Sequence, residues 1–170
     1  MGISVDMFIK TYKANSKAKD KTFEEFLQKH ITKKYIPFMD KVAICGSIVK
    51  VTCHKKEGER EFIRFDSPTR YLIFVMKLIE NYTDIELNDE NVVADYDKLN
   101  EIGAINTLIA TIPENEYTEF STILNMKMDD LRDNEYSTTA LFYNLKESLT
   151  LSEEVLNSVI EEIKKMTKDE

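Results

Sequence analysis

Hydrophobic residues recur at three- and four-residue spacing along most of the chain, which is the period of an α-helix. The first such stripe consists of Val5, Phe8, Ile9 and Tyr12. It predicts a helix over about residues 3–16, followed by a lysine-rich linker. A second helix is predicted from the capping box of Thr22 and Glu25 to about Lys34, because those two side chains satisfy free amides at a helix start.

The segment from Phe38 to Cys53 fits two structures. Its start directly after Pro37 and its apolar residues at helical spacing favour a helix. Its β-branched residues favour a strand instead; they are Ile44, Ile48, Val49, Val51 and Thr52. We expect the helix. The polar turn around Gly58 then allows a small β-hairpin near residues 49–66, flanked by Val51, Cys53, Phe62 and Phe65, which would be the only sheet.

The clearest helix is predicted over Ser67–Tyr82, with Ser67 as its N-cap and Pro68 in its first turn. Its apolar stripe, which begins at Tyr71, makes it the expected centre of the core. Further apolar stripes lie at about residues 95–102, 105–112, 113–132, 141–149 and 150–163. Together these patterns predict an all-α fold: one mostly helical domain of six to eight helices over residues 1–170, in which the helix and basic linker of residues 1–21 can move.

Composition agrees with an ordinary globular chain. Of its 170 residues, 42% are hydrophobic and 32% are charged, and four Gly and three Pro are too few for an all-β barrel or sandwich. No stretch reaches the length of a membrane span, and the N-terminus lacks the features of a secretory signal. Two cysteines are too few for a disulfide framework, so we expect a reduced intracellular setting.

Charge is distributed unevenly. Residues 1–77 hold 16 Lys and Arg against 9 Asp and Glu, whereas residues 78–170 hold 7 against 22. The basic half could meet nucleic acid, an acidic partner, or the acidic half of another copy. A pI near 5.0 makes nucleic acid the least favoured of these. Candidate interface residues are Lys13, Lys17, Lys33, Lys34, Tyr117, Asp129, Asp130, Tyr136 and Tyr143.

Few residues are suited to catalysis. Nucleophilic catalysis needs a base beside the nucleophile, and the chain has only two histidines. His30 falls on the apolar face of its helix, so we expect a partly buried structural role, and His54 follows Cys53 in a polar turn. Cys45, Cys53 and His54 lack a fourth ligand and the paired spacing of a zinc site. We therefore expect no catalytic residue and no cofactor.

An acidic loop offers one partial metal motif. Asp84, Glu86, Asn88, Glu90 and Asp95 place oxygens at the spacing of a calcium-binding loop. Asp89, however, stands where the sharp turn of such a loop needs Gly. A solvated acidic loop is therefore the favoured interpretation, with a cation site at Asp84, Glu86, Asn88 and Asp95 as the alternative.

Two stretches carry a resemblance to known proteins. They are YLIFVMKLIENYTDIEL at residues 71–87 and IGAINTLIATIPENEYTEFSTILNMKMDDLRDNEYS at residues 102–137. They resemble small proteins from the structural modules of tailed phages and prophages of low-GC Gram-positive bacteria. The resemblance implies a non-enzymatic virion or assembly protein, such as a head-to-tail neck component or a tail-assembly factor. It assigns no role to individual residues.

The same resemblance implies the partners and the location of the protein. The partners would be other copies of the chain and phage structural proteins, met in the host cytoplasm during assembly or in the virion, with no membrane partner. The alternative is a small cytoplasmic binding or inhibitory module directed at a host or defence protein. Its acidic residues at 129–135 and 153–162 would then imitate nucleic acid.

Overall fold

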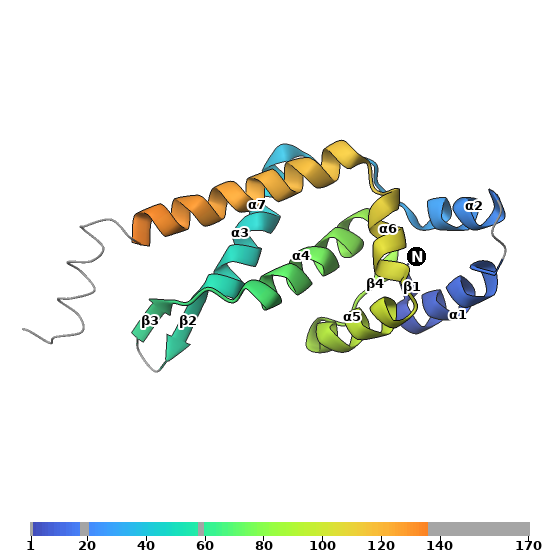
Figure 1. The fold of residues 1–170 in the computed structure, drawn as a ribbon, viewed down its shortest axis with the longest axis horizontal. Coiled ribbons are helices and arrows are strands. Elements are labelled where there is room, and N and C mark those ends of the chain that lie inside the picture. The colour runs from blue at the N-terminus through green and yellow to red at the C-terminus, as the bar shows by residue number, and fades with distance from the viewer. Residues whose placement is uncertain (1, 18–20, 58–59, 136–170) are drawn as a thin grey trace, which may run out of the picture. The chain divides into compact units, whose positions relative to one another are not determined.

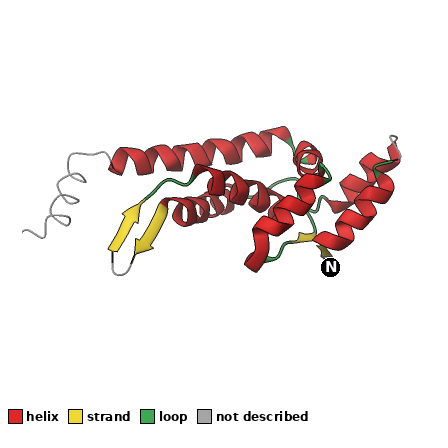
Figure 2. Cartoon of the chain, turned by 60° about the horizontal axis from the view of Figure 1, so that its bottom comes forward, coloured by secondary structure: helices red, strands yellow, loops and turns green. Residues whose placement is uncertain are grey.

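A computed structural model describes residues 2–17, 21–57 and 60–135. The described residues form seven α-helices, one short 3-10 helix and two pairs of short strands, which confirms the mostly helical fold with a small β element (Figures 1 and 2). The chain divides into two compact units, Met1–Met128 and Asp129–Glu170. The helices predicted at 141–149 and 150–163 lie outside the described residues.

The elements follow the predicted order. The helices are α1 (Val5–Asn15), α2 (Lys21–His30), α3 (Phe38–Cys53), α4 (Ser67–Tyr82), η1 (Asp89–Asn91), α5 (Val92–Glu101), α6 (Ala104–Thr111) and α7 (Glu114–Glu135). The strands are β1 (Ile3–Ser4), β2 (His54–Glu57), β3 (Arg60–Ile63) and β4 (Ile85–Glu86). Gly103 separates α5 from α6 with a φ of 70°, a left-handed conformation that glycine adopts without strain.

The segment that fitted both helix and strand is the helix α3. Its buried face consists of Lys41, Cys45, Ile48, Val49, Thr52 and Cys53. Phe38, the first residue of the helix, is 53% exposed. The predicted hairpin follows as the antiparallel pair of β2 and β3, from His54 opposite Ile63 to Glu57 opposite Arg60. Val51 and Cys53 belong to α3 and not to the hairpin.

The hairpin is not the only sheet, so that expectation was wrong. β1 pairs in parallel with β4, with Ile3 opposite Ile85, and the two pairs of strands lie apart in Figure 2. The amide of Ile3 also donates to the carbonyl oxygen of Asp84 at 2.8 Å. Ser4 then caps α1 by accepting a hydrogen bond from the amide of Met7 at 3.4 Å. The described start of the chain is therefore joined to the middle of the sequence.

Two helix boundaries differ from the prediction. α2 begins at Lys21, so Thr22 lies in its first turn, and it ends at His30 rather than near Lys34. The helix stops there because the amide of Thr32 donates to the carbonyl oxygen of Tyr82 at 2.8 Å, outside any helix. α4 begins where predicted, but its N-cap is Asp66, whose carboxylate accepts a hydrogen bond from the amide of Thr69 at 3.1 Å.

Helix α4 is the centre of the core, as predicted. Its buried side chains are Phe74, Val75, Met76, Leu78, Ile79 and Tyr82. It packs against α3 and also against α5 and α6, which lie along a different part of its length in Figure 1. Tyr71, which the sequence placed on this apolar stripe, is 57% exposed. Among the described residues, no helix is both long enough and apolar enough to cross a membrane.

Candidate functional site

A buried cluster of charged and polar side chains joins three helices of the first unit. Lys41 of α3 is 0% exposed, and Glu116 of α7 is 1% exposed. The Nζ atom of Lys41 lies 2.9 Å from Oε1 of Glu116. Oε2 of Glu116 accepts a hydrogen bond from the hydroxyl of Tyr82 at 2.6 Å and another from the amide of Ile36 at 3.0 Å. Both carboxylate oxygens of Glu116 are therefore satisfied.

The cluster reaches the surface through Glu119. This second carboxylate also forms an ion pair with Lys41, and its side chain is 43% exposed. The Nζ atom of Lys41 lies 5.2 Å from the ring centroid of Tyr35 and 5.8 Å from that of Phe120, so aromatic faces complete its surroundings. The two carboxylates exceed the single ammonium group by one negative charge. The surface above the cluster is therefore suited to a cation.

Burial and hydrogen bonding act in opposite directions on the pKa values of this cluster. Burial alone would lower the pKa of Lys41, but its hydrogen bonds to Glu119 and Glu116 outweigh burial and raise it above 10.5. Burial likewise opposes ionisation of Glu116, yet hydrogen bonds from Tyr82 and Lys41 hold its pKa below 4.5. Burial and the bond to Glu116 raise the pKa of Tyr82. Lys41 and Glu116 are therefore both charged at neutral pH.

The cluster predicts how stability depends on pH. Glu116 contributes stability above its unfolded pKa of 4.5, and this is lost as the pH falls through its lower folded value. Lys41 contributes stability below 10.5 that is lost as the pH rises through its higher folded value. Urea midpoints should be nearly constant from about pH 5 to 10 and fall on both sides. The double variant Lys41→Met, Glu116→Gln should lose less stability between neutral and acid pH than the unsubstituted protein. Equal losses in the two proteins would contradict the role given to Glu116.

An open groove lies beside the cluster, between the start of α3 and the outer face of α7. Its lining is Phe38, Glu114, Asn115, Thr118, Glu119, Thr122, Ile123 and Met126. Phe38 is 53% exposed and Met126 is 61% exposed, so two large apolar side chains meet water there. Glu119 belongs to the groove and to the buried cluster alike. The groove thus combines apolar contact area with negative charge.

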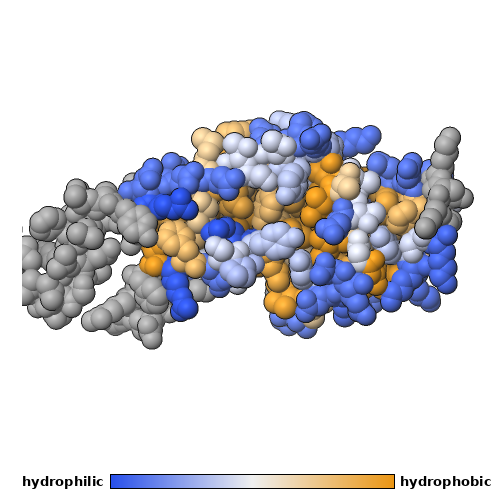
Figure 3. Space-filling model, viewed as in Figure 1, coloured by the Kyte–Doolittle hydropathy of each residue, from blue (hydrophilic) through white to orange (hydrophobic). Residues whose placement is uncertain are grey.

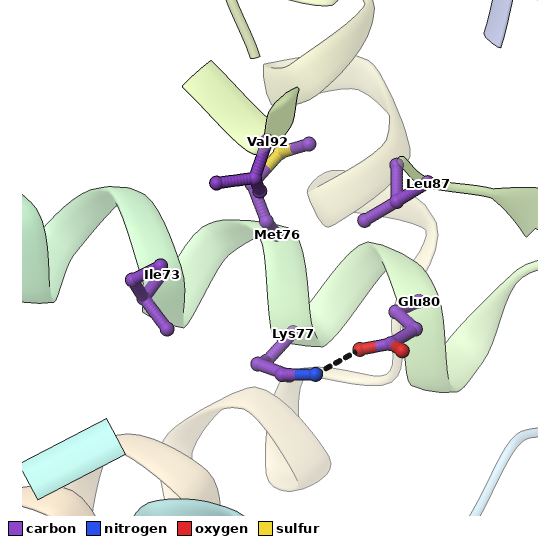
Figure 4. A pocket seen from close by; sticks show the side chains of 6 residues that line it. All are labelled: Ile73, Met76, Lys77, Glu80, Leu87 and Val92. Atoms are coloured by element: carbon purple, nitrogen blue, oxygen red, sulfur yellow. Dashed lines mark hydrogen bonds and ion pairs between the residues drawn. The ribbon is translucent and has the colours of Figure 1, made fainter. Parts of the chain in front are cut away.

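A smaller pocket lies between α4 and the chain that leads into α5. It is lined by Ile73, Met76, Lys77, Glu80, Leu87 and Val92 (Figure 4). Its volume is near 100 Å³. Nζ of Lys77 lies 2.6 Å from Oε2 of Glu80, and Figure 4 shows this ion pair on α4 at the side of the pocket away from Val92. Apolar residues also reach the surface near the centre of the face shown in Figure 3, bordered by hydrophilic ones.

The predicted interface residues come from separate elements. Lys13, Lys17, Lys33 and Lys34 are exposed. Tyr117 is 38% exposed, and its ring lies 6.0 Å from that of Phe74. Asp129 and Asp130 are exposed, with Asp129 paired to Arg132 at 3.3 Å. Tyr136 and Tyr143 lie outside the described residues.

The candidate cation ligands are not gathered into one set. Asp84 instead pairs with Nδ1 of His30 at 2.8 Å, and Asp95 accepts a hydrogen bond from the amide of Asn88 at 2.8 Å. The side chain of Asn88 caps η1, and Glu86 is exposed. In the part of the chain that the structure describes, no group of three or more His, Cys, Asp or Glu residues is placed to hold a metal ion.

The histidines and cysteines occupy structural positions. His30 packs edge-on against the rings of Phe8 and Phe26, with centroids 5.2 and 4.8 Å away, in the partly buried position expected from the sequence. His54 is the C-cap of α3 and begins β2. Cys45 is buried, and burial raises the pKa of its thiol to about 11, against a smaller opposing effect of Lys127. Its thiol is therefore protonated at neutral pH.

Comparisons of the chain with models of protein families, with curated proteins and with solved structures found no match. A functional assignment therefore depends on the residues of this chain alone. Sequence reasoning missed Lys41 and Glu116, although a signal was present. Lys41 precedes Cys45 by four residues, and Glu116 precedes Phe120 by four, so each charge lies on an apolar helical stripe.

Proposed function

We propose that this protein acts through contacts with other proteins, as a virion or assembly component of the head-to-tail neck or tail-assembly kind, and without a catalytic step. The observation that carries the proposal is the groove between α3 and α7, whose lining includes the exposed apolar side chains of Phe38 and Met126 and two glutamates. Contiguous apolar surface rimmed by polar residues is typical of a protein interaction site. Residues 1–77 carry a net positive charge and residues 78–170 a net negative charge, so attraction between copies adds a second means of contact.

The buried cluster supports the same proposal by fixing the walls of the groove. Glu116 and Glu119 lie one turn apart on α7, and Lys41 pairs with both from α3. These ion pairs hold the helix that bears Phe38 against the helix that bears Met126. We infer that this buried ion pair contributes less to net stability than to fixing one arrangement of the two helices. We therefore assign it to positioning the groove.

The resemblance to phage structural modules includes part of the groove. Its two stretches correspond to α4 with β4 and to α6 with α7, so they include the helix that forms one wall of the groove. On this proposal the partners are other copies of the chain and structural proteins of the particle. The protein would act in the host cytoplasm during assembly or remain in the virion.

Mass in solution tests the proposal. At low salt, light scattering on a sizing column should show a species heavier than the 19.8 kDa chain. Its mass should fall as salt rises, because exposed charges are screened beyond about 8 to 10 Å at physiological ionic strength. An unchanging monomer at every salt and protein concentration would contradict self-assembly.

A second role is favoured by one observation. Asp129, Asp130 and Asp133 are exposed on consecutive turns of the last described helix, as the phosphates of a nucleic acid are exposed on its backbone. An inhibitory module would be supported by a monomer that forms a stoichiometric complex with one host nucleic-acid-binding protein. The variant Asp129→Lys, Asp130→Lys should then lose that complex. Retention of that complex by the variant would contradict this second role.

A further inference from the structure

The outer face of α1 is basic and carries one exposed apolar residue. Met7, Lys10, Ala14 and Lys17 follow one another at intervals of three or four residues, and all four are exposed. They therefore share one side of the helix and its C-terminal extension. Lys13 is exposed next to them. We call these five residues the basic face.

The opposite side of α1 holds the helix in place. Val5, Phe8 and Tyr12 are buried, and α1 packs against α2 and α5. The groove, in contrast, is built by α3 and α7, which lie away from α1 in Figure 1. One copy therefore cannot place the basic face of α1 in its own groove while α1 stays packed.

The groove complements the basic face in both charge and polarity. Phe38 and Met126 offer apolar contact area for Met7. Glu114 is exposed at the groove, and Glu119 brings the net negative charge of the buried cluster to the same surface. Complementary charge sets which surfaces meet and in which orientation, while apolar contact supplies most of the binding free energy.

We propose that the basic face of α1 in one copy docks in the α3–α7 groove of the next copy. This inference rests on the proposed function and names the two surfaces that would carry it. Because the surfaces differ, the contact is head-to-tail, and each bound pair of copies still presents one free face and one free groove. Copies therefore add in one direction until the arrangement closes or continues as a filament.

Two variants test the contact. The face variant carries Lys10→Glu and Lys13→Glu, and the groove variant carries Glu114→Lys and Thr118→Lys; all four positions are exposed, so folding should be retained. Each variant alone should be monomeric by light scattering at low salt. Their equimolar mixture should assemble again with the two variants alternating, because the intact face of the groove variant complements the intact groove of the face variant, and the reversed face complements the reversed groove.

Two further chains complete the design. A chain with all four substitutions reverses both surfaces and should assemble again. A control with Lys29→Glu and Lys50→Glu makes the same charge change at exposed positions of α2 and α3 outside both surfaces, and should assemble like the unsubstituted protein. Circular dichroism of every variant should match the unsubstituted chain.

The outcomes separate this inference from the proposed function. If the unsubstituted chain assembles and the face or groove variant assembles equally well, the contact lies elsewhere, and the inference is overturned while the proposed function stands. A mixture of the face variant and the groove variant that stays monomeric overturns it as well. If the unsubstituted chain is monomeric at every salt and protein concentration, both self-assembly and this contact are contradicted.

Discussion

Replacing Lys41 with methionine should lower the free energy of unfolding by about 3–5 kcal/mol, the cost of leaving one partner of a buried ion pair without its counter-charge. Glu116 would remain buried, with hydrogen bonds from Tyr82 and Ile36 but with no cation. Urea unfolding followed by far-ultraviolet circular dichroism measures the change as a lower midpoint at constant slope.

Lys77→Met is the matched control for this prediction. Lys77 also pairs with a glutamate, Glu80, but the two side chains are 37% and 42% exposed. An exposed pair contributes about 0–1 kcal/mol, so this variant should stay close to the unsubstituted protein. Equal losses in the free energy of unfolding for Lys41→Met and Lys77→Met would show that burial does not make the Lys41 pair more important for stability than an exposed pair.

A double substitution separates lost charge pairing from lost packing. Lys41→Met together with Glu116→Gln removes both charges, while the amide oxygen can still accept hydrogen bonds from Tyr82 and Ile36. Much of the loss caused by Lys41→Met alone should therefore be recovered. A double variant as unstable as the single one would place the cost in the lost side-chain packing of the lysine.

The order of helices could be predicted because each apolar stripe specifies its own element. In α3, helical and strand-like signals conflicted, and packing decided between them. Cys45, Ile48 and Val49 share one buried face only when the segment is helical. The β-branched residues express a preference for half-buried surfaces rather than for a strand as such, so the helix can accommodate them.

The boundaries and the second sheet could not be predicted, because they depend on partners far away in sequence. Ile31 pairs with Thr83, and Ile3 pairs with Ile85. Each pairing involves one or two residues, which is too short to leave a period-two pattern. The end of α2 is likewise set by a hydrogen bond from Thr32 to the carbonyl of a residue on another helix, and no local signal encodes it.

The candidate site was missed for a related reason. A lysine or glutamate in isolation is normally read as exposed, since such side chains are rarely fully buried unless paired. Lys41 and Glu116 are 75 residues apart, and only the docking of α3 against α7 shows that each is the other's partner. The groove was not predicted either, because Phe38 fits the apolar spacing of α3 and is nevertheless exposed.

Truncating Phe8 to alanine should cost about 3–5 kcal/mol, as for other large aromatic residues removed from a core. Phe8 is 0% exposed and holds α1 against its neighbours. Its ring lies 5.7 Å from that of Tyr12, 5.9 Å from that of Phe26 and 5.2 Å from that of His30. Removing it leaves a cavity among three rings, and urea unfolding should report the loss as a lower midpoint.

Met7→Ala is the control, because Met7 precedes Phe8 on the same helix but is 56% exposed. Its change in stability should stay within about 0.5 kcal/mol. The two variants also separate stability from assembly: Met7→Ala should weaken the contact between copies while leaving the fold intact, since Met7 belongs to the basic face and Phe8 to the core. A loss below about 1 kcal/mol for Phe8→Ala would mean that α1 is not anchored through these rings, and the basic face would then lack the rigid support that docking in the groove requires.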